Sequence, residues 1–280
     1  MAPSEPLPQP LPEPATDEGR VGLAALLADA GHALVALDFD GTLSPIVADP
    51  DDARAHPDVP PVLERLAGHG VRVAVVTGRP AALAVEYGRL ESVRGLVVLG
   101  HYGLERWEGG RVMSPPDASG VAAARSRLPG LLAELGAPEG TWVEDKGHAV
   151  AVHTRRARDP VAALDLLRQP LESLAAETGL VLEPGRLVLE LRPPGADKGA
   201  ALRSLVEPGA TSAVVFVGDD LGDLPAFEEV ARLRAEGLPG LLVCSGSTEV
   251  TEVAERADLV VEGPEGVAAL LGALDARLGG

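Results

Sequence analysis

Runs of mostly apolar residues alternate with a helix-like stretch through the first hundred positions. The runs occupy residues 33–37, 71–76 and 95–100, and residues 57–70 between the first two read as a helix that ends on glycine. An apolar run without alternation is typical of a strand that helices cover on both faces, as in the middle of a parallel sheet. Strands and helices at this spacing predict right-handed βαβ units. We therefore expect a parallel sheet flanked by helices.

The pattern changes after Trp107. Helical stretches at about 119–135 and 160–178 alternate there with strand-like segments at 141–153 and 180–191. Within the last segment, alternate residues form an apolar face and a mixed face: Leu187, Leu189 and Leu191 against Val188, Glu190 and Arg192. Such alternation is typical of an open sheet with one wet or ligand-facing side. It predicts an α+β domain distinct from the parallel sheet.

Apolar runs of the first kind return at residues 213–219, 241–244 and 258–261. The parallel sheet therefore resumes after the alternating region. We expect a discontinuous core, residues 20–109 and 195–280, with a cap domain inserted at residues 110–194.

The beginning of the chain has a different composition. Residues 1–19 contain six prolines and four acidic residues and show no apolar periodicity. Because such a segment buries too little surface to offset the entropy lost on ordering, we expect a disordered tail. The first helix is expected to begin near Val21.

Composition narrows the class of protein. The chain has 24 basic and 42 acidic residues and a formal charge of −18, which argues against a nucleic-acid or anionic membrane surface. Its one cysteine, Cys244, allows neither a disulfide framework nor a cysteine zinc site, so a reducing, cytoplasmic setting is expected. No stretch approaches 18 consecutive apolar residues, and the first residues form no export signal.

The apolar run at 33–37 stops on two carboxylates and a glycine. Asp38 and Asp40 lie two positions apart, so in an extended chain both side chains point to one side, and Gly41 allows a sharp turn after them. Ligands of parallel sheets bind at the carboxyl ends of the strands. One carboxylate can attack a substrate while the other handles a proton or a metal. A strand that ends in an ordinary Asx-Gly turn produces the same local pattern.

Three later stretches favour the chemical interpretation. In chain order the four motifs are Asp38-Phe39-Asp40-Gly41-Thr42, Thr77-Gly78-Arg79, Asp197-Lys198-Gly199 and Gly218-Asp219-Asp220-x-x-Asp223. Together they resemble the haloacid dehalogenase (HAD) superfamily of phosphatases. The resemblance implies an α/β fold: a Rossmann-like core with a parallel sheet flanked by helices, and an α+β cap of the C2 type between the second and third motifs.

The resemblance also implies how the carboxylates divide the work. Asp38 would be the nucleophile that forms an aspartyl-phosphate, and Asp40 would protonate the leaving oxygen and then activate water. Carboxylates beside a dianionic phosphoryl group repel it unless a divalent cation lies among them, and Mg²⁺ prefers such oxygen ligands. Its implied ligands are the Asp38 side chain, the Asp40 backbone carbonyl and Asp219, with Asp220 and Asp223 outside them.

Two further residues complete the implied phosphoryl site. Thr77 would bind a phosphoryl oxygen through its hydroxyl and its backbone amide, although a threonine here also serves as an ordinary helix N-cap. Lys198 opens a helix, where a lysine is usually solvated. Beside Asp38 and a phosphate it would contribute about 4 kcal/mol per charge pair at about 4 Å and an effective dielectric constant near 20.

Four stretches in and before the expected cap are more specific. They are Gly100-His101-Tyr102-Gly103-Leu104-Glu105, Val143-Glu144-Asp145-Lys146, Ala151-Val152-His153-Thr154-Arg155 and Leu189-Glu190-Leu191-Arg192-Pro193. With the core motifs they resemble the trehalose-6-phosphate phosphatase family over about residues 32–262. The resemblance implies substrate contacts from Gly78, Arg79, Tyr102, Gly103, Glu105, Glu144, Lys146, His153 and Glu190. His153 and Arg155 would assist the cap contacts, and a solvent-facing ladder of salt bridges on the cap sheet is the alternative for Glu144, Lys146, His153 and Arg155.

The chain departs from this family at two places. Tyr102 stands where the family mostly has histidine, and His101 precedes it, so a substrate contact is expected to have moved. Gly222 replaces a usual threonine in the fourth motif, which removes a supporting hydrogen bond but no metal ligand. Trp107 either stacks on a sugar or fills the core, and the core is favoured.

The expected activity is Mg²⁺-dependent hydrolysis of trehalose 6-phosphate to trehalose and phosphate through an aspartyl-phosphate. Two alternatives stay open: a related capped phosphatase acting on sucrose phosphate or a glycosyl phosphoglycerate, and a catalytically silent regulatory domain. The second requires a lost motif carboxylate or lysine, and none is lost. A dinucleotide site is disfavoured because no Gly-x-Gly-x-x-Gly loop follows the first strand. The implied partners are a small sugar phosphate and a trehalose-phosphate synthase, with neither nucleic acid nor membrane, and the chain is expected to be a monomer.

Overall fold

The computed structural model describes residues 10–47, 49–115, 119–185, 187–246 and 251–280. The chain divides into two compact units, which we call the core unit (residues 1–113 and 197–280) and the inserted unit (residues 114–196). None of the helices in these described ranges combines the length and the apolar character that crossing a bilayer requires.

The core unit is built on an eight-stranded sheet with the order β12-β11-β10-β1-β2-β3-β4-β5. The strands are β1 (Ala33–Leu37), β2 (Arg72–Val76), β3 (Val97–Gly100), β4 (Glu105–Glu108), β5 (Arg111–Met113), β10 (Ala213–Gly218), β11 (Gly240–Gly246) and β12 (Leu259–Glu262). Neighbours from β12 to β3 pair in parallel, which confirms the expected parallel sheet. The sheet then continues through β4 and β5, which pair antiparallel.

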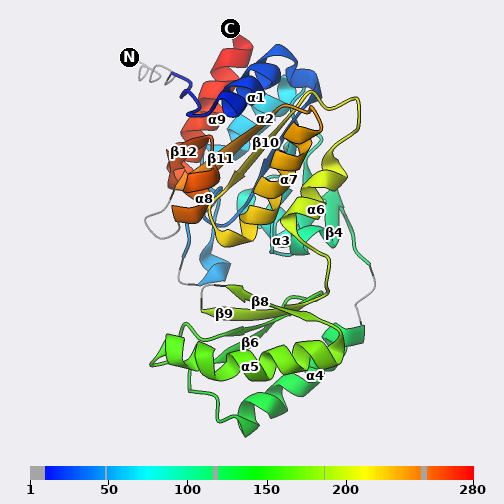
Figure 1. Ribbon diagram of the computed structural model, residues 1–280, viewed down its shortest axis with the longest axis vertical. Helices are drawn as coiled ribbons and strands as arrows, with labels where there is room; N and C mark the ends of the chain where they lie inside the picture. Colours follow the sequence, from blue (N-terminus) through cyan, green and yellow to red (C-terminus); the bar gives the residue numbers. More distant parts are fainter. Residues whose placement is uncertain (1–9, 48, 116–118, 186, 247–250) are drawn as a thin grey trace. The chain divides into compact units, whose positions relative to one another are not determined.

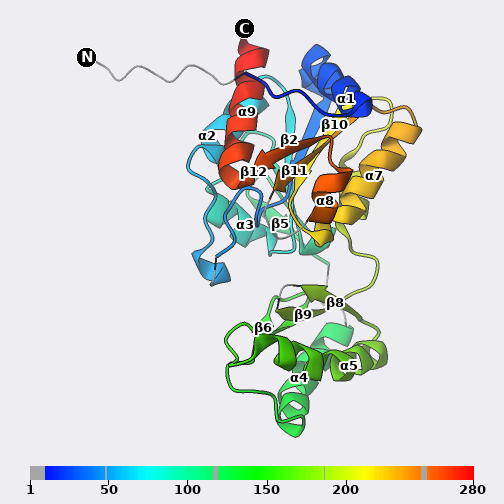
Figure 2. The ribbon, with the colours of Figure 1, turned by 60° about the vertical axis from the view of Figure 1, so that its left-hand side comes forward.

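Helices cover both faces of this sheet (Figures 1 and 2). One face carries α1 (Asp17–Ala28), α2 (Val59–Gly68), α3 (Ala81–Gly88) and α9 (Gly263–Gly279), and the other carries α6 (Lys198–Leu205), α7 (Leu224–Ala235) and α8 (Thr251–Arg256). Val35 and Leu37 of β1 pack into the first apolar cluster, while Leu34 and Ala36 pack into the second. Burial on both faces is therefore the reason that β1 has no polar alternation. Short 3₁₀ turns lie at Ala30–His32, Pro50–Asp52, His101–Gly103 and Leu221–Asp223.

The hairpin of β4 and β5 does not follow from the apolar pattern. All three residues of β5 are exposed, and Gly109 and Gly110 adopt positive φ angles in the turn. Trp107 of β4 is only 8% exposed and belongs to the larger apolar cluster, so its expected place in the core is confirmed.

The first helix begins earlier than expected. α1 starts at Asp17 instead of near Val21, because the Thr16 hydroxyl accepts a hydrogen bond of 3.0 Å from the Gly19 amide and caps the helix. The same hydroxyl donates to the buried carboxylate of Asp258. Residues 17–19 therefore belong to a docked helix and not to the expected tail, of which residues 1–9 lie outside the described ranges.

The inserted unit has its own sheet and its own core. Its strands are β6 (Trp142–Asp145), β7 (Val150–His153), β8 (Val181–Gly185) and β9 (Val188–Arg192), in the antiparallel order β6-β7-β9-β8. Both helices, α4 (Ser119–Glu134) and α5 (Pro160–Thr178), pack on one face of this sheet (Figure 1). That face supplies Val152, Leu189 and Leu191 to the apolar cluster. The alternate residues of the strands are left for the opposite face.

Candidate active site

Three neighbouring strands bring the first, second and fourth motifs to one edge of the core sheet. β10, β1 and β2 lie side by side, and Leu37 at the end of β1 pairs with Val217 and Val75. Asp38, Thr77 and Asp219 each follow directly on one of these strands. Because parallel strands end at the same edge, residues far apart in sequence meet there.

Lys198 joins this edge as the first residue of α6. Its Nζ lies 2.7 Å from Asp38 Oδ1 and 2.7 Å from Asp223 Oδ1, and all three side chains are buried. Asp197 caps the helix by accepting a hydrogen bond of 2.8 Å from the Ala200 amide. The third motif thus begins a helix at the point where its lysine reaches two carboxylates.

Asp223 has both carboxylate oxygens engaged. Its Oδ1 accepts from Lys198, and its Oδ2 accepts from the backbone amides of Asp219 at 2.9 Å and Asp220 at 3.1 Å. Gly222, which departs from the family pattern, donates its own amide to Asp220 at 2.9 Å. Backbone amides and a lysine therefore hold Asp223 without a threonine hydroxyl.

Several carboxylates surround Lys198 at the carboxyl ends of β10 and β1, and they affect one another's pKa values. Burial raises the pKa of Asp38 well above its ordinary value, an effect that Lys198 opposes and Asp223 increases. Burial, then the charges of Asp223 and Asp220, raise the pKa of Asp219 to about 8. Burial alone would lower the pKa of Lys198, but Asp223 and Asp38 raise it well above its ordinary value, so the lysine stays charged. One ammonium leaves an excess of buried negative charge.

The donor set fits a divalent cation. Asp38, Asp219 and Asp223 each offer a carboxylate oxygen, and these oxygens lie within 4.8 Å of one another. Hard cations such as Mg²⁺ bind oxygen donors of this kind. A cation would offset the charges of Asp223 and Asp220, which add to the effect of burial on the pKa of Asp219.

The turn after Asp38 is held from several sides. Gly41 has a φ of +78°, and a Cβ there would lie 2.0 Å from Asp219 Oδ2, so only glycine fits. Ser245 at the end of β11 donates a hydrogen bond of 2.7 Å to the Gly41 carbonyl. Nothing in the sequence pattern singles out Ser245 except its position after an apolar run. Asp40 turns to Arg79, whose Nε and Nη2 each lie 2.7 Å from a carboxylate oxygen.

One expectation about Thr77 is wrong. Its backbone amide donates to the Leu99 carbonyl at 2.9 Å, as part of the ladder between β2 and β3, and so is not available to a phosphoryl oxygen. The Thr77 hydroxyl accepts from the Arg79 amide at 3.1 Å and keeps its own hydrogen for another acceptor.

The segment after β3 lies beside the second motif. His101, Tyr102 and Gly103 all have positive φ angles, and the Tyr102 amide donates to the Thr77 carbonyl at 3.0 Å. A Cβ on Gly78 would lie 2.8 Å from the Tyr102 hydroxyl, so this glycine lets the tyrosine approach. Glu105 accepts a hydrogen bond of 2.8 Å from the Ala81 amide at the start of α3. At least one of its oxygens therefore serves the local fold.

The structure brings the four expected cap residues to one face of the inserted unit's sheet. Glu144 and Glu190 both pair with Ala151, on either side of β7, and so share the face that is opposite the helices. Lys146 Nζ lies 2.5 Å from Glu190 Oε2, and His153 Nε2 lies 2.6 Å from Glu144 Oε2. The side chains thus form one ion pair, Lys146 with Glu190, and one hydrogen-bonded pair, His153 with Glu144.

Two details of this face were not anticipated. Trp142 stacks on His153 with ring centroids 4.5 Å apart, which fixes the imidazole plane. Glu190 is 5% exposed, and within the described part of the chain its Oε1 has no hydrogen-bond partner. A buried carboxylate oxygen that accepts no hydrogen bond costs free energy of folding. This atom is therefore suited to accept a hydrogen bond from a hydroxyl group of a ligand.

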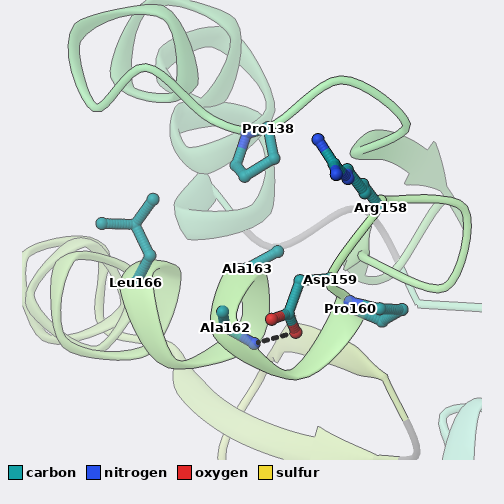
Figure 3. Close-up of a pocket in the computed structure, with 7 residues that line it drawn as sticks. All are labelled: Pro138, Arg158, Asp159, Pro160, Ala162, Ala163 and Leu166. Carbon is teal, nitrogen blue, oxygen red and sulfur yellow. Dashed lines mark hydrogen bonds between the residues drawn. The ribbon is translucent and has the colours of Figure 1, made fainter.

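A cavity of about 660 Å³ lies elsewhere in the inserted unit, at the start of α5 (Figure 3). Pro138, Arg158, Asp159, Pro160, Ala162, Ala163 and Leu166 line it. Asp159 accepts a hydrogen bond of 3.0 Å from the Ala162 amide and so caps the helix. Since none of the motif residues lines this cavity, it has no part in the site described above.

Comparison with known proteins identifies the family. Residues 36–261 match the Trehalose-phosphatase family. A trehalose-phosphate phosphatase of Mycolicibacterium paratuberculosis is 35% identical over 221 residues, which cover 75% of this chain and 54% of the relative. A probable trehalose-phosphate phosphatase of Sinorhizobium fredii is 33% identical over 219 residues, covering 75% of this chain and 78% of the relative.

The fold agrees with that of a solved structure. The C-terminal domain of the C. albicans trehalose-6-phosphate phosphatase superposes with a TM-score of 0.76 at 20% identity, covering 96% of this chain and 99% of that one. This chain spans about half the length of the Mycolicibacterium relative. On the family match and the two relatives, the chain belongs to the trehalose-phosphatase family.

Proposed function

We propose that this chain hydrolyses trehalose 6-phosphate to trehalose and phosphate, with Mg²⁺ and through an aspartyl-phosphate on Asp38. The observation that carries the proposal is the buried contact of Lys198 with Asp38 and Asp223, beside Asp219, at the edge where β10, β1 and β2 end. Membership of the trehalose-phosphatase family supports the substrate.

In the first half-reaction the Asp38 carboxylate attacks phosphorus, and the bond from phosphorus to the sugar oxygen breaks. Asp40 gives a proton to that oxygen. In the second half-reaction Asp40 takes a proton from water, which attacks phosphorus and breaks the bond to Asp38. Lys198 opposes the rise that burial causes in the pKa of Asp38, and it fixes the orientation of the carboxylate, since its ammonium lies 2.7 Å from Oδ1.

The Asp38 and Asp219 side chains and the Asp40 backbone carbonyl would hold the cation, with Asp220 and Asp223 outside them. The engagement of both Asp223 oxygens supports its outer place. Bound there, Mg²⁺ supplies positive charge that offsets the phosphoryl oxygens. The Thr77 hydroxyl, beside Gly78, would donate to a phosphoryl oxygen.

We assign the inserted unit, expected as a cap at residues 110–194, the task of binding the sugar rings. Sugar hydroxyls would form hydrogen bonds with Glu144, Lys146, His153 and Glu190. The Glu190 Oε1 atom, which has no hydrogen-bond partner among the described residues, supports this most directly. Tyr102, Gly103 and Glu105 are proposed to contact the substrate from the core unit. A cytoplasmic location, a monomeric state and a trehalose-phosphate synthase as the supplier of substrate complete the proposal.

A substrate panel tests this function. Phosphate release, expressed as kcat/KM, is expected to be at least about a hundredfold higher for trehalose 6-phosphate than for glucose 6-phosphate, because buried polar groups reject an analogue that leaves them unpaired. A higher kcat/KM for sucrose 6-phosphate or a glycosyl phosphoglycerate would contradict the proposed substrate but not the proposed phosphatase chemistry. No release from any ester, p-nitrophenyl phosphate included, would favour the silent regulatory domain.

Glu190→Gln is expected to raise KM for trehalose 6-phosphate at least about tenfold, because hydrogen bonds to a buried charged group contribute about 1.5–3 kcal/mol. Turnover of p-nitrophenyl phosphate, which has no sugar, should stay the same. Glu183→Gln is the matched control: Glu183 pairs with Glu190 across β8 and β9, but it is 43% exposed and bound to Arg192. Equal KM values for both variants and the parent chain would remove Glu190 from the sugar site.

A further inference from the structure

The Asp40 carboxylate is held in the fork of the Arg79 guanidinium. Arg79 Nε lies 2.7 Å from Oδ2, and Nη2 lies 2.7 Å from Oδ1. Arg79 is 13% exposed and Asp40 is 42% exposed, so a largely buried arginine grips a more open carboxylate. Paired bonds of this kind set both the direction and the rotation of a carboxylate, which a single point charge does not.

The fork itself is fixed before any substrate arrives. The guanidinium carbon lies 5.5 Å from the centre of the Phe39 ring and 5.5 Å from that of the Tyr87 ring. Phe39 is fully buried, and the Tyr87 hydroxyl donates to Asp51 at 3.2 Å. The Arg79 amide also donates to the Thr77 hydroxyl. Two aromatic rings and the backbone therefore hold the arginine in place.

The backbone at Asp40 is held, but its carboxylate depends on a partner from another segment. Asp40 forms an isolated β-bridge with Ser44, immediately before the turn that Gly41 begins with a positive φ angle. Among the described residues, Arg79 is the side chain that hydrogen-bonds its carboxylate. Without the two hydrogen bonds from Arg79, the partly exposed Asp40 side chain could rotate away from the leaving sugar oxygen or from the attacking water.

We propose that Arg79 is a positioning residue that acts through Asp40, and not a residue that binds the phosphoryl group. The proposal rests on the function proposed above, in which Asp40 is the acid and base. With both oxygens accepting from Arg79, Asp40 is set to take a proton from water. To donate a proton to the sugar oxygen in the earlier step, it releases one arm of the fork.

A double-mutant cycle of Arg79→Gln and Asp40→Asn tests this role. In the parent background, Arg79→Gln is expected to lower kcat at least about tenfold, with KM and the inhibition constant of inorganic phosphate within about threefold of the parent values. In the Asp40→Asn background the same change is expected to alter kcat less than about twofold. Equal losses in both backgrounds, or a tenfold rise in the phosphate constant, would make Arg79 a phosphoryl ligand and overturn the proposal.

Arg79→Lys and Arg54→Gln complete the design. Lysine keeps the charge but cannot bridge two oxygens, so its kcat is expected to stay within about threefold of that of Arg79→Gln, and full rescue would overturn the role of the fork. Arg54 lies 4.3 Å from the Tyr87 ring centre and bonds only backbone carbonyls among the described contacts, so Arg54→Gln should keep parental kinetics. If Arg79→Gln does not fold by circular dichroism, the cycle runs with Arg79→Lys. If the parent chain shows no turnover, both the proposed function and the role of Arg79 are wrong. If the parent chain is active but the effects of the Arg79 and Asp40 substitutions on kcat are additive, only the role of Arg79 is wrong.

Discussion

Asparagine at position 38 is expected to reduce kcat for trehalose 6-phosphate to less than about one hundredth of the parent value, a loss of at least about 2.7 kcal/mol of transition-state stabilisation. An amide has the shape of the carboxylate but cannot attack phosphorus. The fold should survive, because Lys198 keeps its contact of 2.7 Å with Asp223 and because burial already disfavours the charged form of Asp38.

Three measurements separate this outcome from misfolding. The melting temperature of Asp38→Asn should equal or exceed that of the parent chain, and calorimetry should still detect substrate binding. Asp40→Asn is the companion variant: it should retain more activity and accumulate a phosphorylated chain that acid quenching traps. A kcat above about one hundredth of the parent value for Asp38→Asn would count against covalent catalysis at this residue.

Removal of divalent cations is expected to abolish phosphate release, and added Mg²⁺ should restore it. The reason is that the site buries more carboxylates than ammonium groups. Burial, then the charges of Asp223 and Asp220, raise the pKa of Asp219 to about 8, and among the described residues Lys198 is the one ammonium in contact with Asp38 and Asp223. A cation that binds only the folded chain also stabilises it, by about 2.7 kcal/mol at a concentration about one hundred times its dissociation constant. Thermal unfolding with and without Mg²⁺ therefore gives a second readout that needs no substrate.

Asp219→Asn identifies the ligand. This variant should need at least about tenfold more Mg²⁺ for half-maximal activity, because it removes one charged donor. Asp17→Asn is the control, since Asp17 lies on the exposed first turn of α1. Full activity of the parent chain in excess chelator would contradict the role assigned to Asp219.

The sequence predicts those parts of the fold that depend on residues close together in the chain. β1 is an apolar run covered on both faces, and it ends where Asp38 begins, so strand and candidate nucleophile are found together. Parallel pairing then gathers Thr77 and Asp219 at the same edge, because neighbouring strands end together. The alternation in β9 likewise predicts that Glu190 lies on the face opposite to that of Leu189 and Leu191.

The parts that the sequence does not reveal depend on distant partners. Ser245 reaches the Gly41 carbonyl from 204 positions away, and Thr16 reaches Asp258 from 242 positions away. Neither side chain differs from an ordinary surface residue in the local pattern. The sequence also does not reveal that the Thr77 amide is engaged, because only the register of β2 against β3 pairs this amide with the Leu99 carbonyl.

The order of the strands has a consequence for how the chain is made. β1 pairs with β10, so Ala33 has no strand partner on this side until Ala213 has been synthesised. The inserted unit lies between them in sequence, is continuous and has its own apolar cluster. During synthesis the inserted unit can therefore acquire its structure before the core sheet has its central pair. A folded insert is more compact than an unfolded chain of the same length, so it lowers the entropy lost when β10 joins β1. Until β10 is made, β1 lacks its partner on that side, and an unpaired strand edge favours aggregation.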